Sequence, residues 1–281
     1  MVPSQSIFEL TPPSIETLAQ SFSAITLPEM ERVRLMNRTD TKFLLPLSRL
    51  PSLLNQLSEH YRWLEIDGQR FCAYETLYFD TVDLRFYHAH RTQRLNRYKI
   101  RQRHYVASNL TFTEIKHKTN KGRTVKTRIP NAYPPGKGFD PDSAVFLTRH
   151  TGFGPDKLNP VLWVEYIRLT LVSQTTAERL TIDLNLNFRN DFGYRAYPQV
   201  VVAELKQDAR QPSFFLNLMK KARVQPGSLS KYCLGLISLD PSLKQNLFKP
   251  KLNHFRKLLA YDHLVATPFC TGSPESDRIA G

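Results

Sequence analysis

The chain has 281 residues, of which 41% are hydrophobic and 23% charged, a composition typical of a globular protein with one large domain or two small ones. Its net charge of +14 favours a polyanionic partner such as nucleic acid, an anionic membrane or a phosphorylated small molecule. A generally basic surface that serves solubility is the simpler alternative. Three cysteines without a CxxC pair argue against a disulfide framework or a zinc site.

We expect neither a targeting signal nor a membrane-spanning segment in the sequence. No apolar run approaches the ~20 residues that a membrane-spanning helix needs. The first residues lack the basic region and the long apolar stretch of a secretory signal. We therefore expect no membrane span and a cytoplasmic location, which the cysteine usage also fits.

The N-terminal part predicts a loose arm followed by three elements. Residues 1–12 form the arm, and residues 13–25 predict a short amphipathic helix with Ser14 as its cap. "NRTDTKFLL" (37–45) predicts a strand. Leucines at helical spacing within residues 47–61 predict a helix.

The middle of the chain changes to strands that are separated by turn signals. The predicted strands are 71–81, 97–106, 110–118 and 123–129. The turns include "ASN" at 107–109 and "NKG" at 120–122, and both suit hairpins. We therefore expect these strands to pair in the order of the chain.

The C-terminal part alternates long strands with helices. Residues 130–141 predict a Pro/Gly loop, and Asp142 or Ser143 is the predicted cap of a helix over 141–150. Further strands are predicted at 161–173, 179–189 and 199–207. In the second of these, Leu180, Ile182, Leu184 and Leu186 form one apolar face. A helix is predicted over 212–224, opened by Pro212, and a last helix within 247–265.

About eight strands in meander order, with helices at the breaks, predict an α+β protein with an antiparallel sheet or a closed barrel. We see no domain boundary inside residues 30–240. The expected organisation is an arm and short helix over 1–29, one domain over 30–240, and a helix with a disordered tail over 241–281.

Cations recur on every second residue of the predicted strands, so they share one face of each strand. "RYKIRQRHY" (97–105) is the clearest case. Taken together, these faces hold thirteen cations and four acids: Arg38, Lys42, Arg97, Lys99, Arg101, Arg103, Lys116, Lys118, Lys126, Arg128, Arg168, Arg179 and Lys206, with Asp40, Glu114, Asp183 and Glu204.

A solvated polar face is the ordinary explanation for any one such strand. Across seven strands it predicts mixed Ser, Thr, Gln and Glu, whereas Arg and Lys dominate here. A closed sheet with so basic an interior requires a polyanion and water to fill it. The pattern therefore indicates a basic tunnel for a polyphosphate group, and its few carboxylates are suited to a divalent metal.

Other site signatures are weak. No Walker sequence and no kinase-like glycine-rich loop is present, so phosphate binding would depend on side chains. His88 and His90 at strand spacing could be a metal pair, but surface histidines are the simpler interpretation.

The motifs, in order, are "TDTKFLL", "ETLYFDT", "YKIRQRHY", "FTEIKHKTNKGRTVKTRI", "EYIRLTL", "RLTIDLNL", "VVAELK" and "SKYCLGL". This series, over roughly residues 30–237, resembles the VTC domain, the polyphosphate polymerase branch of the triphosphate tunnel metalloenzymes. The resemblance implies an eight-stranded antiparallel tunnel with flanking helices. It also implies transfer of the terminal phosphate of ATP to a growing polyphosphate chain, with Mn²⁺ or Mg²⁺.

The resemblance also implies roles for single residues. Lys42, Arg101, Arg103 and Glu204 would be catalytic, with Glu204 as the metal ligand and Glu114 or Asp183 as helpers. Phosphate-binding residues from the resemblance would be Lys116, Lys126, Arg168, Arg179 and Lys231, and Arg38, Lys99, Lys118 and Lys206 join them because they share the charged faces.

The stretch Arg38-Thr-Asp40-Thr-Lys42 departs from the ExExK start of the related hydrolases and cyclases. An arginine replaces the first glutamate, which removes a metal ligand and favours the polymerase branch. The alternatives are a tripolyphosphatase or nucleoside triphosphatase on the same tunnel, and a polyphosphate-binding module without chemistry. The expected partners are ATP and polyphosphate and no specific nucleic acid, while membrane-associated partner proteins and the oligomeric state stay open.

Overall fold

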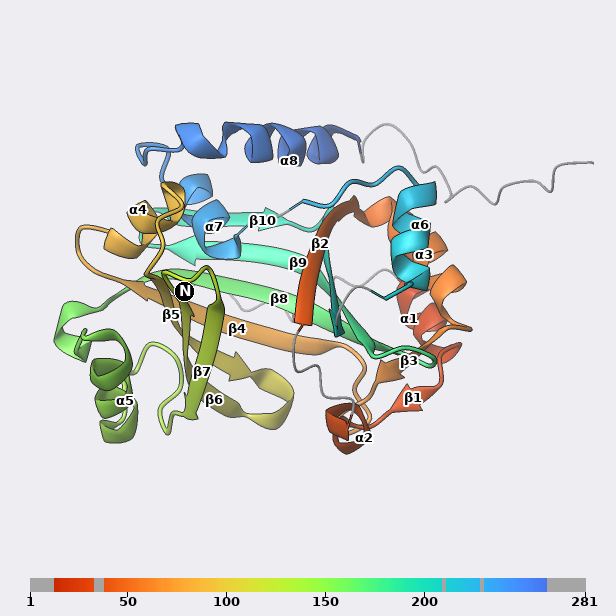
Figure 1. The fold of residues 1–281 in the computed structure, drawn as a ribbon, viewed down its shortest axis with the longest axis horizontal. Coiled ribbons are helices and arrows are strands. Elements are labelled where there is room, and N and C mark those ends of the chain that lie inside the picture. The colour runs from red at the N-terminus through yellow and green to blue at the C-terminus, as the bar shows by residue number, and fades with distance from the viewer. Residues whose placement is uncertain (1–12, 33–37, 209–210, 228–229, 262–281) are drawn as a thin grey trace, which may run out of the picture.

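One long sheet, antiparallel except where β1 pairs with β3, runs through the protein, and helices pack against it (Figure 1). The computed structural model describes residues 13–32, 38–208, 211–227 and 230–261. The strands are β1 (Ala24–Ile25), β2 (Arg38–Pro46), β3 (Tyr61–Leu64), β4 (Cys72–Asp80), β5 (Arg97–Tyr105), β6 (Leu110–Lys118), β7 (Thr124–Pro130), β8 (Asn159–Ser173), β9 (Glu178–Asn190), β10 (Gly193–Tyr197) and β11 (Val200–Asp208). The helices are α1 (Pro13–Gln20), α2 (Leu27–Arg32), α3 (Leu50–Leu57), α4 (Arg85–Arg91), α5 (Pro141–Thr151), α6 (Phe214–Lys221), α7 (Lys231–Leu239) and α8 (Lys249–Tyr261).

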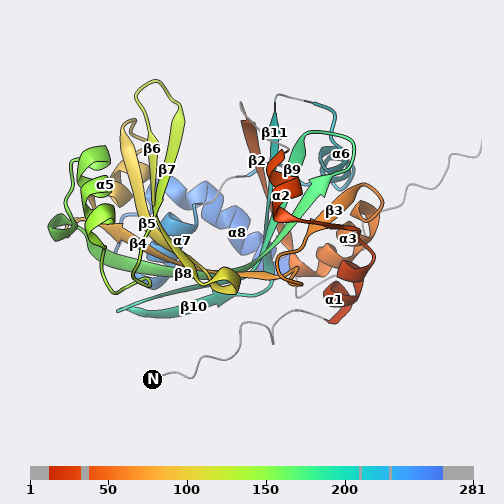
Figure 2. The ribbon, with the colours of Figure 1, turned by 90° about the horizontal axis from the view of Figure 1, so that it is seen from below.

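The main path of the sheet has the strand order β2-β11-β9-β8-β4-β5-β6-β7. Seen from below, the sheet bends into a U, with β5, β6 and β7 in one wall and β2, β11 and β9 in the other (Figure 2). The predicted α+β class with an antiparallel sheet is confirmed, and the main path has the eight strands expected. Among the described residues β2 and β7 do not pair, because they form the tips of opposite walls, so the sheet is open rather than a closed barrel.

A bulge in β8 and β9 divides the inner, concave face of the U into two parts. The pairing of the two strands shifts between Glu165 and Ile167, and Asn185 adopts a left-handed backbone with φ 50°. The prediction that Leu180 to Leu186 form one continuous apolar face was therefore wrong. Leu180 packs in the core on the convex side, whereas Leu186 has moved to the opposite face and packs with α7 and α8.

Three large apolar cores hold the sheet in shape, and a smaller fourth one joins β1, α2, β3 and β8. On the convex side, residues of α1, α3 and α6 pack against β2, β8, β9 and β11, and α4 and α5 contribute to a second core with β4, β5 and β6. On the concave side, α7 and α8 cover one end only, in a core that includes Leu162, Phe188 and Phe255. The other end of the concave face, which we call the open end, carries the charged residues.

Several predicted boundaries moved for local reasons. The helix expected over 47–61 is a 3-10 turn and then α3, and Tyr61 already belongs to β3. The cap of α5 is Asp140, whose carboxylate accepts a hydrogen bond from the Ser143 amide at 2.7 Å. The predicted cap at Asp142 or Ser143 was thus wrong by two or three residues. Helix α6 begins after Ser213 rather than at Pro212.

The sequence patterns missed the short elements α2, α4, β1, β3 and β10 and gave α7 only as a motif. His88 and His90 lie on helix α4, so the interpretation of the two histidines as a pair on a strand was wrong. The arm at 1–12 and the tail after 261 lie outside the described residues, and the three-part domain division stays a prediction. Within the ranges described, every helix is too short or too polar to span a membrane.

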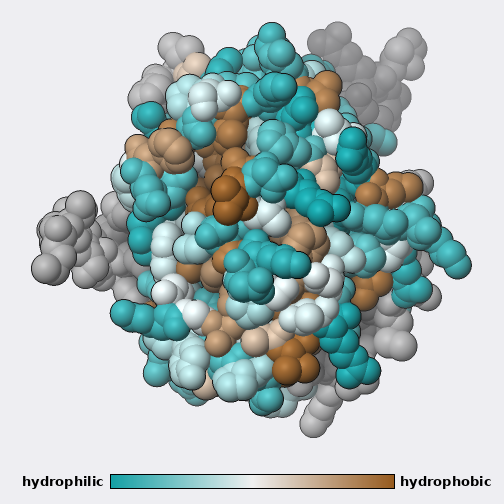
Figure 3. Space-filling view, turned by 90° about the vertical axis from the view of Figure 1, so that its left-hand side faces the viewer, coloured by the Kyte–Doolittle hydropathy of each residue, from teal (hydrophilic) through white to brown (hydrophobic). Residues whose placement is uncertain are grey.

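The molecular surface at the α5 side is mostly hydrophilic (Figure 3). Its hydrophobic residues form separate small patches in this view. Single exposed apolar side chains, such as Val145 on α5 with 67% exposure, are common on protein surfaces and require no partner.

Candidate functional site

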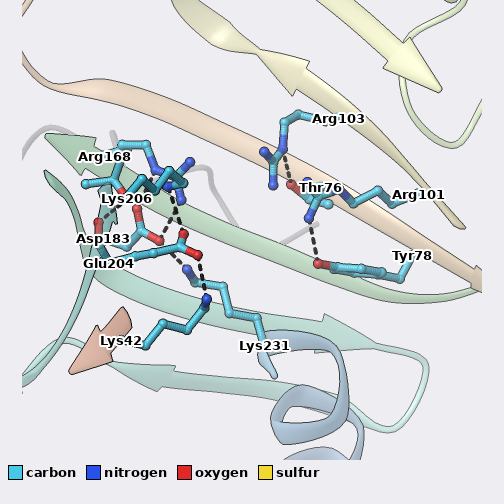
Figure 4. Close-up of polar contacts among 11 residues, drawn as sticks. Lys42, Thr76, Tyr78, Arg101, Arg103, Arg168, Asp183, Glu204, Lys206 and Lys231 are labelled. Carbon is cyan, nitrogen blue, oxygen red and sulfur yellow. Dashed lines mark hydrogen bonds and ion pairs between the residues drawn. The ribbon is translucent and has the colours of Figure 1, made fainter. Parts of the chain in front are cut away.

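Charged side chains from strands that are far apart in sequence meet on the concave face (Figure 4). Lys42 comes from β2, Glu204 and Lys206 from β11, Asp183 from β9 and Arg168 from β8. Arg101 and Arg103 come from β5 on the opposite wall, and Lys231 reaches in from the start of α7. The antiparallel register explains this meeting, since residues directly opposite one another on neighbouring strands point to the same face.

Glu204 is held between two lysines. Its Oε1 lies 2.5 Å from Lys42 Nζ, its directly paired neighbour on β2, and its Oε2 lies 2.9 Å from Lys206 Nζ. Burial alone would raise the pKa of Glu204, but Lys206 and Lys42 together hold it well below its usual range. Burial in turn lowers the pKa of Lys206 to about 8, although Glu204 counteracts the effect.

Asp183 is held in the same way by an arginine and a lysine. Arg168 donates from Nε and Nη2 to the two carboxylate oxygens at 2.6 and 2.8 Å, a bidentate pair, and Lys231 Nζ donates to Oδ2. Asp183 is 3% exposed. Burial raises its pKa, but Arg168 and Lys231 outweigh burial and keep the carboxylate ionised.

Glu114 on β6 is the third such carboxylate and is fully buried. Arg101 donates to its Oε2 from Nε and Nη2 at 2.8 and 2.5 Å, and Lys126 Nζ lies 2.5 Å from its Oε1. Burial opposes the charge of Glu114, yet Arg101, Arg103 and Lys126 hold its pKa far below normal. For Lys126, burial outweighs Glu114 and lowers the pKa to about 7.

Further cations on the β5–β6 wall have no acidic partner within 4 Å among the described residues, and Lys99, Arg103 and Lys116 are the ones nearest Arg101 and Glu114 in the register. Lys116 stands directly between Lys99 on β5 and Lys126 on β7 in the register. Burial, followed by the charges of Arg101, Arg103 and Lys126, lowers the pKa of Lys116 well below its usual value. Like charges opposite one another destabilise a sheet, so this row favours a bound anion.

Aromatic rings order the arginines, a feature that the charge pattern alone missed. The rings of Tyr74 and Tyr166 stack with centroids 5.4 Å apart. The Arg168 guanidinium lies 5.1 Å from the first ring and 5.2 Å from the second, and that of Arg103 lies 5.4 Å from the Tyr74 ring. No cation shares the face of β4 that carries Tyr74, so the charge pattern could not identify this ring.

Helix α7 positions Lys231 through a buried carboxylate that the sequence analysis also missed. Asp80 is fully buried and accepts hydrogen bonds from the amides of Thr81, Phe86 and Tyr87. The Tyr232 hydroxyl donates to the same carboxylate. Because Tyr232 follows Lys231 directly, Asp80 fixes the end of α7 that carries this lysine.

The remaining candidate residues lie at the edges of the group. Lys118 stands opposite Arg97 in the register. Arg179 donates to Met30 Sδ at 3.7 Å, and the side chain of Arg38 lies outside the description. His90 Nε2 lies 3.0 Å from the Tyr98 carbonyl oxygen and its Nδ1 accepts from Arg97. In the described ranges, no group of three or more His, Cys, Asp or Glu side chains is arranged to hold a metal.

This arrangement suits a multivalent anion. Each of three carboxylates is fully occupied by two cations, and further cations face the same space without such partners. Arginine side chains that are preordered by aromatic rings and carboxylates can grip phosphate oxygens in a bidentate way, and lysines add point charges.

The family model described as "VTC domain" matches residues 37–134 and 153–240 of the chain. No curated protein matches it significantly in sequence. Among solved structures, the chain is similar to HpAC1 from Hippeastrum, which is described as a candidate adenylyl cyclase with a dominant triphosphatase activity. The TM-score is 0.47 at 15% sequence identity, and the match covers 75% of this chain and 99% of HpAC1. The chain is also similar to candidate adenylate cyclases from Bacillus halodurans (TM-score 0.46, 14% identity, 69% and 96% coverage) and Vibrio parahaemolyticus (0.41, 11%, 72% and 99%).

Proposed function

The chain belongs to the VTC domain family, and we propose that it transfers the γ-phosphate of ATP to a growing polyphosphate chain on its concave face. The observation that carries this proposal is the set of Lys99, Arg103 and Lys116, which have no acidic partner among the described residues, whereas the nearby Arg101 and Lys126 both pair with Glu114. Such a set needs several negative charges at short spacing, which a phosphate chain supplies.

In the proposal, Arg101, Arg103, Lys116, Arg168 and Arg179 hold the phosphates of the nucleotide. Phosphoryl transfer requires positioning and neutralisation of charge more than covalent chemistry by the protein. Lys42 would lie near the transferred phosphoryl group and stabilise its developing charge. Lys126, Lys206 and Lys231, with Arg38, Lys99 and Lys118, would contribute to the field that guides the chain.

For a divalent ion, Mn²⁺ or Mg²⁺, we propose Glu204 as the protein ligand. Two cations engage each of the three carboxylates, but the side chain of Glu204 is 18% exposed, whereas those of Glu114 and Asp183 are 0% and 4% exposed. Their burial favours Glu114 and Asp183 as holders of the neighbouring cations. When bound, such an ion would neutralise charge on the phosphate oxygens.

We also propose that the protein works in the cytoplasm, where ATP is available, and two buried free cysteines, Cys72 and Cys233, are compatible with a reducing compartment. ATP and polyphosphate are the proposed partners.

The test is incubation of the purified protein with ATP and Mn²⁺ or Mg²⁺, with chains read on a gel and free phosphate measured in parallel. We expect polyphosphate chains, and a loss of about 10²-fold or more in rate for Lys42→Ala and for Glu204→Gln. Lys157→Ala, on the 3-10 turn after α5, is the matched control and should retain full activity. Release of phosphate without chains would make the protein a triphosphatase, and binding without either product a polyphosphate-binding module.

A further inference from the structure

A cluster of partly exposed aromatic rings lies at the open end of the concave face, beyond the phosphate-binding cations. It consists of Tyr74 on β4, Tyr105 on β5 and Phe112 on β6, and we call it the aromatic platform. The Tyr74 and Tyr105 ring centroids are 5.0 Å apart, and those of Tyr105 and Phe112 are 5.7 Å apart. Tyr74 also orders Arg103 and Arg168, whereas Tyr105 and Phe112 are not needed to explain the binding of phosphate.

The platform adjoins the proposed phosphate site directly. Tyr105 is two residues from Arg103 along β5, so their Cα atoms are roughly 6.8 Å apart and both side chains point to the concave face. Phe112 stands opposite Arg103 in the register, and the Arg103 guanidinium lies 5.4 Å from the Tyr74 ring. A group that is covalently attached to a phosphate on Arg103 would therefore reach these rings.

A cation belongs to the platform as well. The Arg128 guanidinium lies 4.6 Å from the centroid of the Phe112 ring, and its Nη1 donates to the Tyr105 hydroxyl at 3.3 Å. Arginine planes and aromatic faces are the two surfaces on which proteins stack nucleobases. The other end of the concave face has no comparable surface in the part of the chain that the structure describes, since Tyr78 and Tyr232 are buried there at 5% and 1% exposure.

We propose that the aromatic platform binds the base of a nucleoside triphosphate whose phosphates lie on Arg101 and Arg103. This inference rests on the proposed function, because it assumes that the cations hold a triphosphate. Stacking distinguishes a nucleotide from an inorganic phosphate chain but hardly distinguishes one base from another. ATP and GTP therefore bind similarly, and inorganic tripolyphosphate gains nothing from Tyr105 and Phe112.

The test compares dissociation constants for ATP, GTP and tripolyphosphate, measured by calorimetry without divalent ions. Tyr105→Leu and Phe112→Leu each weaken the binding of ATP and GTP about five- to tenfold, which is the lower end of the effect expected when one stacking ring is removed. Neither variant changes the dissociation constant of tripolyphosphate. Tyr105→Phe keeps the ring and retains most of the affinity for ATP. Tyr194→Leu and Phe192→Leu, at 59% and 72% exposed positions near β10, are matched controls without effect.

Equal weakening of ATP and tripolyphosphate by Tyr105→Leu, or no weakening of ATP, overturns the platform. Failure of the wild-type protein to bind either ligand contradicts the proposed function itself. Normal binding of tripolyphosphate together with unchanged ATP binding in both leucine variants refutes only the platform.

Discussion

Glu114, Asp183 and Glu204 each contact two cations, and this arrangement is the unit from which the concave face is built. Glu114 shows the principle most clearly, because it is fully buried and bonded to both Arg101 and Lys126. A buried ion pair adds little net stability, but removing one partner leaves an uncompensated charge. The acids of the site thus make it feasible for the folded protein to keep so many cations together.

Replacing Glu114 with glutamine tests this role. We expect Glu114→Gln to lower the free energy of unfolding by about 3–5 kcal/mol, since Arg101 and Lys126 lose their counter-charge. Urea denaturation measures the change, with the exposed Asp142→Asn on α5 as the control. Because the variant has two more free cations, tripolyphosphate should raise its melting temperature more than that of the wild type. An equal rise in both proteins would show that these cations do not face the anion.

Lys126 should make anion binding depend on pH near neutrality. Burial lowers its pKa to about 7 in the free protein, and a bound phosphate raises it, because the protonated lysine is favoured. Its contribution to affinity is therefore complete below pH 7 and is lost as pH rises through the higher pKa of the complex. The loss should not exceed about tenfold per pH unit, because one proton is involved.

The measurement is the tripolyphosphate dissociation constant from pH 6 to pH 9 for the wild type and Lys126→Arg. Arginine stays charged throughout this range, so the variant should show a flatter profile, while titration of the ligand is common to both. Parallel profiles would mean that Lys126 does not titrate in contact with the phosphate.

At the scale of elements, α7 is the part that converts an open sheet into a site with a closed end. Its Ser230 cap accepts from the Cys233 amide, Tyr232 is tied to Asp80, and Lys231 reaches Asp183. Gly235 allows the helix to lie close to the sheet: a Cβ there would be 2.6 Å from side-chain atoms of both Leu162 and Phe188.

Gly235→Ala should therefore destabilise the protein, although alanine is normally the better helix former. We expect a loss of about 1–3 kcal/mol from overpacking, with weaker tripolyphosphate binding because Lys231 is displaced. Gly227→Ala is the control, since nothing lies within 4 Å of its added Cβ. Chemical denaturation and calorimetry check both effects, and a stabilised Gly235→Ala protein would show that α7 is not closely packed.

The long strands and most of the cationic face could be predicted because alternation with a period of two residues reports directly which side chains share a face. Arg101, Arg103 and Lys116 met on one face as expected. Leu186 did not follow the rule, because a bulge is a long-range feature of pairing that composition does not reveal. The roles of Asp80 and Tyr232 were also missed, since they lie 152 residues apart and only the fold brings them together.

At the scale of the whole molecule, the protein is a U-shaped antiparallel sheet with a basic inner surface, covered by α7 and α8 at one end (Figure 2). The net charge of +14 is thus not spread evenly: a substantial part of it converges on one face from both walls. Oriented positive charge of this kind raises the local concentration of anions and accelerates their binding.

The most direct test of this account is tripolyphosphate binding by the double variant Arg103→Gln/Lys116→Gln. Neither residue has an acidic partner among the described residues, so their removal leaves no buried carboxylate unpaired. The account predicts a loss of affinity of about 100-fold or more, while Arg149→Gln/Lys157→Gln, which removes the same charge on the α5 side, has little effect. Equal affinity in the two double variants would contradict a phosphate site on the concave face.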